Sequence, residues 1–125
     1  MTLQLLLVED KDRTAQQILS ILAETPFEVT RAKDGLGGLN QAKKSLYDVV
    51  LIDHKMPLMD GLTLLKNLRD VKGYEQTPLL FMTTDDPRQI ADKAVKLGAD
   101  AVLAKPVEQH MLLTEIQRLA PRHVA

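Results

Sequence analysis

Short apolar runs alternate with longer stretches of helical periodicity, and this alternation constrains the fold more than any other feature of the chain. Four runs are apolar at almost every position, at residues 3–8, 49–52, 79–82 and 101–104. Runs of this kind predict strands buried on both faces of a parallel sheet. Residues 27–31 instead alternate apolar and polar side chains, which predicts a half-exposed strand at the edge of the sheet.

The stretches between and after these runs carry apolar residues at helical spacing. The stripes are Ala15, Ile18, Leu19 and Leu22; Leu36, Leu39 and Ala42; Leu62, Leu65 and Leu68; Ile90, Ala94 and Leu97; and Leu112, Ile116 and Leu119. Strict alternation of strand and helix predicts an α/β fold, in which helices cover both faces of a doubly wound, five-stranded parallel sheet. The flavodoxin-like order 2-1-3-4-5 places the alternating second strand at an edge. Asp34 and Asp60 are predicted helix caps, Asp12 a helix start and Gly98 a helix stop.

Length and composition exclude several classes of protein. The 125 residues correspond to one domain, residues 1–125, without cysteines for disulfides or thiolate metal sites. Because 16 basic and 17 acidic residues nearly cancel, we expect no direct binding to nucleic acid. No apolar run approaches the ~20 residues that span a bilayer, and no signal peptide opens the chain. The composition therefore predicts a cytoplasmic domain with no membrane partner.

Acidic residues follow two of the apolar runs. Glu9 and Asp10 come directly after residues 3–8, and Asp53 comes directly after residues 49–52. In the predicted topology these two strands flank the switch point, where ligands bind beyond the carboxyl ends of the strands. Three carboxylates that converge on one cleft repel one another unless a cation is present. Mg²⁺ fits, since it prefers a few carboxylate oxygens and keeps several water molecules.

Two further polar residues are predicted to reach the same edge. Thr83 follows the apolar run 79–82, and Lys105 follows the run 101–104 and precedes Pro106. A hydroxyl and an ammonium beside clustered carboxylates suit phosphoryl transfer, in which a carboxylate acts as the nucleophile and cations neutralise the phosphoryl oxygens.

At these residues the chain resembles a response-regulator receiver domain of two-component signalling. The resemblance extends from Leu3 to Leu119 and is most specific in the D-x-x-M-P-x-M-D-G run that spans Asp53 to Gly61. It implies that Asp53 is the phosphoacceptor, Thr83 the switch hydroxyl and Lys105 the partner of the phosphoryl group. It also implies that Mg²⁺ binds to Asp10, Asp53 and the backbone carbonyl of Lys55, with Glu9 acting mostly through water.

The resemblance also implies a function. The domain would accept a phosphoryl group from a sensor histidine kinase or a histidine phosphotransfer protein, and would then change its binding to a downstream protein. It would be a signalling module that catalyses only its own phosphorylation and dephosphorylation. An alternative is the N-terminal receiver of a longer regulator. A flavin carrier and an aspartyl phosphatase of similar fold are also considered. The largely acidic run Glu9-Asp10-Lys11-Asp12 disfavours a flavin phosphate, and Glu9-Asp10 is not the D-x-D pair typical of such phosphatases.

Three positions need separate expectations. Val102 stands where many family members carry Tyr or Phe, so the aromatic part of the usual switch, and the dimer typical of one branch, are not expected. Lys55 and Asp85 flank the predicted site with opposite charges, so we expect them to pair across the cleft. His54 follows Asp53 in the strand, so its side chain is expected to point away from that of Asp53 and not to bind the metal.

Overall fold

The computed structural model describes residues 3–120, so the prediction that the domain includes residues 1–2 and 121–125 lies outside the described part. The strands are β1 (Leu3–Val8), β2 (Phe27–Ala32), β3 (Val49–Asp53), β4 (Leu79–Thr83) and β5 (Ala101–Ala104). The helices are α1 (Asp12–Leu22), α2 (Gly35–Lys44), α3 (Gly61–Arg69), α4 (Pro87–Lys96) and α5 (Gln109–Leu119). Every predicted strand and helix is present.

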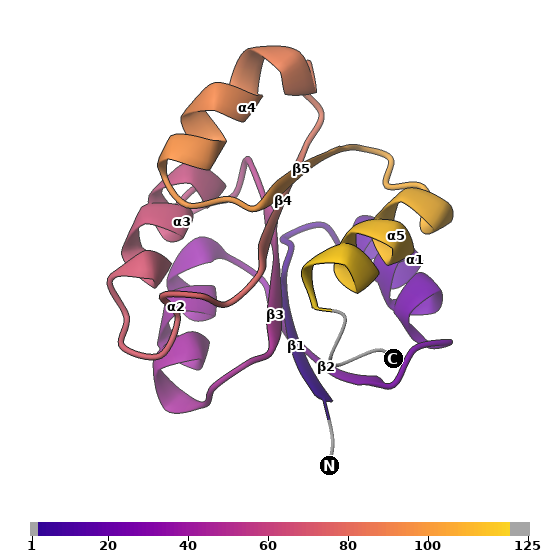
Figure 1. Ribbon diagram of the computed structural model, residues 1–125, viewed down its shortest axis with the longest axis horizontal. Coiled ribbons are helices and arrows are strands. Elements are labelled where there is room, and N and C mark those ends of the chain that lie inside the picture. Colours follow the sequence, from indigo (N-terminus) through magenta and orange to yellow (C-terminus); the bar gives the residue numbers. More distant parts are fainter. Residues whose placement is uncertain (1–2, 121–125) are drawn as a thin grey trace.

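All strand pairs are parallel, and the order across the sheet is β2-β1-β3-β4-β5. Figure 1 shows α1 and α5 on one face of the sheet and α2, α3 and α4 on the other. The predicted doubly wound α/β fold is confirmed, with the alternating strand β2 at an edge.

Two apolar clusters fill the spaces between the sheet and its helices. Along β1, Leu6 and Val8 belong to the cluster under α2, α3 and α4, whereas Leu5 and Leu7 belong to the cluster under α1 and α5. Successive side chains of a strand point to opposite faces, so a strand covered on both faces must be apolar at every position. This is the reason for the unbroken apolar runs in the sequence.

The predicted helix ends are also confirmed. The side chains of Asp34 and Asp60 cap α2 and α3 by accepting hydrogen bonds from the N–H groups of Gly37 (2.6 Å) and Thr63 (2.9 Å). Asp12 is the first residue of α1, and Gly98 follows α4 with a φ of 121°, a left-handed conformation that favours glycine. In the part of the chain that the structure describes, no helix is long and apolar enough to cross a bilayer.

Candidate functional site

Three carboxylates meet where β1 and β3 end. Glu9 and Asp10 follow β1, Asp53 is the last residue of β3, and one oxygen from each of the three lies within 4.8 Å of the others. Glu9 is fully buried and Asp53 is 3% exposed. The parallel pairing of β1 with β3 brings the carboxyl ends of both strands to the same edge of the sheet. The structure thus brings together the three acidic residues that the sequence singled out.

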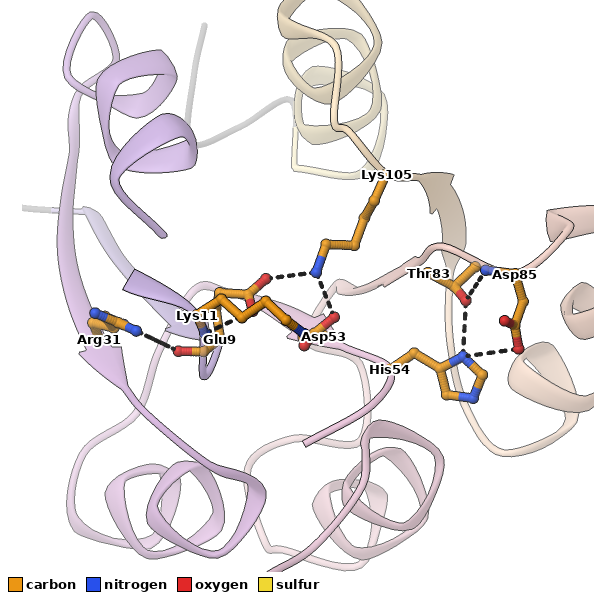
Figure 2. Close-up of polar contacts among 8 residues, drawn as sticks. All are labelled: Glu9, Lys11, Arg31, Asp53, His54, Thr83, Asp85 and Lys105. Carbon is orange, nitrogen blue, oxygen red and sulfur yellow. Dashed lines mark hydrogen bonds and ion pairs between the residues drawn. The ribbon is translucent and has the colours of Figure 1, made fainter. Parts of the chain in front are cut away.

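Lys105 places its ammonium between two of these carboxylates. Its Nζ lies 2.9 Å from Glu9 Oε1 and 2.8 Å from Asp53 Oδ1, and only 8% of its side chain is exposed (Figure 2). The Lys105 N–H donates to the carbonyl of Thr83 at 2.8 Å, which anchors the segment after β5 to the end of β4. The predicted meeting of the lysine with the acidic cluster is therefore present.

For both Glu9 and Lys105, the effect of burial on the pKa opposes the effect of their mutual hydrogen bond. Burial raises the pKa of Glu9 above 4.5, although hydrogen bonds from Lys105 and from the Lys11 N–H lower it in part. Burial lowers the pKa of Lys105, but hydrogen bonds to Asp53 and Glu9 outweigh burial, so that the pKa lies above 10.5. The lysine is therefore a fixed positive charge at neutral pH.

The backbone before α1 is held by Arg31 of β2, which the sequence analysis did not single out. Its Nε and Nη2 donate to the Glu9 carbonyl at 3.1 and 2.8 Å, and its Nη1 lies 2.8 Å from Asp12 Oδ1. The Glu9 N–H in turn donates to the Ala32 carbonyl at 3.1 Å. These contacts fix the turn that carries Glu9 and Asp10. Arg31 pairs with Leu7 across β1 and β2, and this register places its side chain near the end of β1, close to Glu9.

The donor atoms of the cluster suit a hard divalent cation. Within residues 3–120, the buried oxygens Asp10 Oδ1 and Asp53 Oδ2 have no hydrogen-bond partner. Leaving buried carboxylate oxygens without a partner is costly, and a bound Mg²⁺ would satisfy them. The geometry therefore fits the magnesium site predicted from the sequence. The part assigned to the backbone carbonyl of Lys55 stays a prediction.

The start of α3 packs directly on the backbone of Asp53. The Gly61 N–H donates to the His54 carbonyl at 2.7 Å. A Cβ at position 61 would collide with the Asp53 carbonyl oxygen and would lie 2.8 Å from the Phe81 ring. Glycine is required here because the close approach leaves no space for a side chain. Gly61, the last residue of the D-x-x-M-P-x-M-D-G run, thus lets α3 pack against the Asp53 backbone and contributes no side chain to the site.

Thr83, at the end of β4, forms its side-chain hydrogen bonds with residues other than Asp53. Its hydroxyl is 2.8 Å from His54 Nδ1 and accepts a hydrogen bond from the Asp85 N–H at 3.0 Å. Figure 2 shows the His54 ring turned toward the Thr83 hydroxyl and away from the Asp53 carboxylate. The expectation that His54 points away from Asp53 agrees with this geometry, but the sequence analysis missed the contact with Thr83.

Lys55 and Asp85 form the predicted ion pair, with 2.9 Å between Lys55 Nζ and Asp85 Oδ1. The hydrogen bond from Lys55 lowers the pKa of Asp85 below 3.8, so the carboxylate is charged at neutral pH. Both side chains are substantially exposed, so solvent screening leaves the pair little effect on stability. The pair spans the loops that follow β3 and β4.

Val102 is half-buried and lines a cavity of about 310 Å³ together with Pro106 and Met111. The cavity lies over β5 and the start of α5. The expectation that the aromatic part of the usual switch is missing at Val102 stays a prediction.

Comparisons with known proteins identify relatives that match nearly the whole chain. The family model of the response regulator receiver domain matches residues 5–117. The transcriptional regulatory protein DltR of Streptococcus agalactiae is 37% identical over 115 residues, which are 92% of this chain and 50% of DltR. The chain therefore spans about half the length of this curated relative.

Solved structures agree with the fold. The receiver domain of the sensor histidine kinase PA1611 from Pseudomonas aeruginosa, solved with a magnesium ion in its active site cleft, superposes with a TM-score of 0.88 at 25% identity, covering 97% of this chain and 99% of that one. The chemotaxis protein CheY4 of Vibrio cholerae has a TM-score of 0.88 at 31% identity, covering 95% of this chain and 99% of its own.

Proposed function

The chain belongs to the response regulator receiver domain family, and on this premise we propose that Asp53 is its phosphoacceptor. The state of the Asp53 carboxylate carries the proposal. The side chain is 4% exposed, Oδ1 is held at 2.8 Å by Lys105 Nζ, and Oδ2 has no hydrogen-bond partner within residues 3–120. A carboxylate fixed by a cation on one oxygen and open on the other is poised to act as a nucleophile. The family match also favours this reading over a flavin carrier or an aspartyl phosphatase.

In the proposed reaction an Asp53 oxygen attacks the phosphorus of a phosphohistidine. A P–O bond forms, the P–N bond breaks, and its electron pair returns to the imidazole nitrogen of the donor, which then takes up a proton. The product is an acyl phosphate on Asp53. The Lys105 ammonium stabilises the negative charge that collects on the phosphoryl oxygens and the carboxylate.

Magnesium would be held by Asp10 and Asp53, with the Lys55 carbonyl as a further ligand and Glu9 acting through water. When bound, the ion neutralises phosphoryl oxygens and offsets the repulsion among the carboxylates. The magnesium ion in the PA1611 receiver domain supports this assignment. The Lys105 ammonium links the buried Glu9 and Asp53 carboxylates and thereby orients Asp53.

The same groups support hydrolysis of the acyl phosphate by the domain itself. In this proposal the Lys55–Asp85 pair, whose side chains are 64% and 40% exposed, tunes the access of the attacking water. The proposed activity is therefore limited to the domain's own phosphorylation and dephosphorylation.

The proposed donors are a sensor histidine kinase or a histidine phosphotransfer protein. Because DltR is a transcriptional regulatory protein twice as long as the matched region, a longer regulator with a separate effector domain stays open as the context of this receiver. The cytoplasmic location inferred from the sequence is part of the same proposal.

The test is phosphorylation by acetyl phosphate in the presence of Mg²⁺, followed by intact mass measurement. The wild-type chain should gain one phosphoryl group and Asp53→Asn should gain none. Asp92→Asn, which removes an exposed carboxylate on α4, is the matched control and should behave like the wild type. Equal yields of phosphorylation in Asp53→Asn and the wild type would show that the acceptor is elsewhere.

A further inference from the structure

The Thr83 hydroxyl is held in place by two contacts that both lie away from the proposed phosphoacceptor. Its Oγ1 is 2.8 Å from His54 Nδ1 and 3.0 Å from the Asp85 backbone nitrogen. In Figure 2 the Thr83 hydroxyl points toward the His54 ring and the Asp85 backbone, whereas the Asp53 carboxylate turns toward Lys105. To bind a phosphoryl group on Asp53, the hydroxyl has to turn from these partners toward Asp53.

The His54 ring is fixed in its own position. His54 follows Asp53, the strand partner of Met82, and its N–H donates to the Met82 carbonyl at 2.9 Å. The ring packs against Phe81 with 5.1 Å between ring centroids, and His54 is 8% exposed. A buried and packed ring is not free to follow Thr83 when the hydroxyl moves, and little water is available to take its place. The carboxylate oxygen Asp85 Oδ2 lies 3.7 Å from Nδ1, beyond hydrogen-bond distance, so it does not replace the hydroxyl unless it moves as well.

We propose that His54 is a positioning residue that holds the Thr83 hydroxyl away from Asp53 in the resting domain. The proposal rests on the function of Asp53 as phosphoacceptor and on the predicted role of Thr83 as the hydroxyl that binds the phosphoryl group. In the tautomer whose Nδ1 is unprotonated, the Thr83 hydroxyl donates its proton to His54. Donating that proton to a phosphoryl oxygen instead breaks the contact and leaves Nδ1 without that partner. His54 thereby lowers the fraction of molecules in which Thr83 is ready to bind the phosphoryl group.

This fraction sets the apparent affinity for a phosphoryl ligand. A ligand that binds only one of two conformations has its apparent Kd raised in inverse proportion to the population of that conformation. Removing the hydrogen bond of the resting state raises the population of the competent state. The loss of one buried hydrogen bond changes such an equilibrium by about three- to tenfold. His54 therefore weakens phosphoryl binding although it does not touch the phosphoryl group.

Beryllofluoride, a stable mimic of the phosphoryl group, provides the test with the full chain in the presence of Mg²⁺. His54→Phe keeps an aromatic ring against Phe81 but removes Nδ1, and we expect its apparent Kd to fall about three- to tenfold. His54→Asn keeps a polar atom near the position of Nδ1, and its Kd should return toward that of the wild type. In a Thr83→Ala background, His54→Phe should leave the Kd unchanged, because the contact is already absent.

The outcomes separate this inference from the proposed function. An unchanged or raised Kd in His54→Phe overturns the inference, as does an equal decrease with and without Thr83, since a merely structural effect of the ring does not depend on the hydroxyl. If the wild type does not bind beryllofluoride at all, the proposed function itself fails and the inference falls with it.

A spectroscopic signature in the wild-type chain provides a second readout, with the variants used only for assignment and reference. The ¹⁵N resonance of His54 Nδ1, assigned among the three histidines of the chain by its loss in His54→Phe, reports the hydrogen bond to Thr83 directly. Beryllofluoride should shift it toward the value found in Thr83→Ala. A resonance that stays unmoved in the saturated wild type would show that Thr83 does not leave His54, and would refute the proposal.

Discussion

Lys105 is the only basic side chain that contacts the buried carboxylates Glu9 and Asp53 in the described part of the chain, so removing its charge is a direct test of the electrostatics of the site. The substitution Lys105→Met keeps most of the aliphatic volume, and 8% of the lysine side chain is exposed, so the change in packing is small. Its main effect is to leave two nearly buried carboxylates, 0% and 4% exposed, without their shared cation.

Protonation of a carboxylate limits the loss of stability in Lys105→Met. A buried carboxylate without a partner becomes neutral instead of staying charged, and one proton shared between the two acids removes most of their repulsion. Protonating a glutamate with an ordinary pKa of ~4.3 at pH 7 costs about 1.36 kcal/mol for each of roughly 2.7 pH units, which is about 3.7 kcal/mol. The same calculation at pH 5 gives about 1 kcal/mol. Lys105→Met should therefore lower the free energy of unfolding by about 3–4 kcal/mol at pH 7 and far less at pH 5.

The direction of the pH dependence follows from the pKa of Glu9. Burial already raises this pKa above 4.5, and the Lys105 hydrogen bond is the largest effect that lowers it. Without Lys105 the pKa rises further, so the folded variant binds more protons than the unfolded chain over a wider range above pH 4.5. Stability then falls as the pH rises through this range.

Urea unfolding followed by far-ultraviolet circular dichroism is the assay, because the chain contains no tryptophan. The measurements are made with a chelator, so that no divalent cation replaces the lost charge. With an m value of ~1.5 kcal/mol per M, the midpoint should fall by roughly 2 M at pH 7. Arg118→Met, which breaks the 2.7 Å exposed pair with Glu115, is the control and should cost at most about 1 kcal/mol. A loss below 1 kcal/mol for Lys105→Met at pH 7, or a loss equal at pH 5 and pH 7, would refute the reasoning.

Three further predictions concern the metal, the α3 contact and the α5 cap. Mg²⁺ at 100 times its Kd should stabilise the wild type by about 2.7 kcal/mol and Asp10→Asn by less; an unmoved melting temperature of the wild type would contradict the site. Gly61→Ala should cost about 1–3 kcal/mol in urea unfolding because its Cβ meets the Asp53 carbonyl, and wild-type stability in this variant would refute the close contact. The N–H groups of His110 and Met111 lower the pKa of Glu108 below 4.5, so its stabilising effect on α5 is present above that pH and is lost as the pH falls through the lowered value. The amide resonances of residues 110 and 111 should therefore titrate below pH 4.5 and cease to do so in Glu108→Gln; a midpoint at or above 4.5 would count against the cap.

The order of strands and the place of the acidic cluster are determined by the sequence alone. Runs that are apolar at every position must be covered on both faces, and strict alternation with helices then leaves few topologies. Because the strands are parallel, residues at their carboxyl ends share one edge of the sheet. This is why Glu9, Asp10 and Asp53 could be assigned to one site from their positions after β1 and at the end of β3.

The sequence placed Lys105 at the acidic cluster and paired Lys55 with Asp85, but the individual bonds across the sheet were decided only by the tertiary structure. Lys105 bonds to Glu9 across 96 residues of sequence, and Arg31 reaches the Glu9 carbonyl across 22. Such contacts depend on strand register and side-chain rotamers, which leave no periodic trace in the sequence. The contact between His54 and Thr83 is the clearest case: alternation along β3 correctly turned the ring away from Asp53, but only the pairing of Asp53 with Met82 in β4 sets that ring beside the hydroxyl of Thr83.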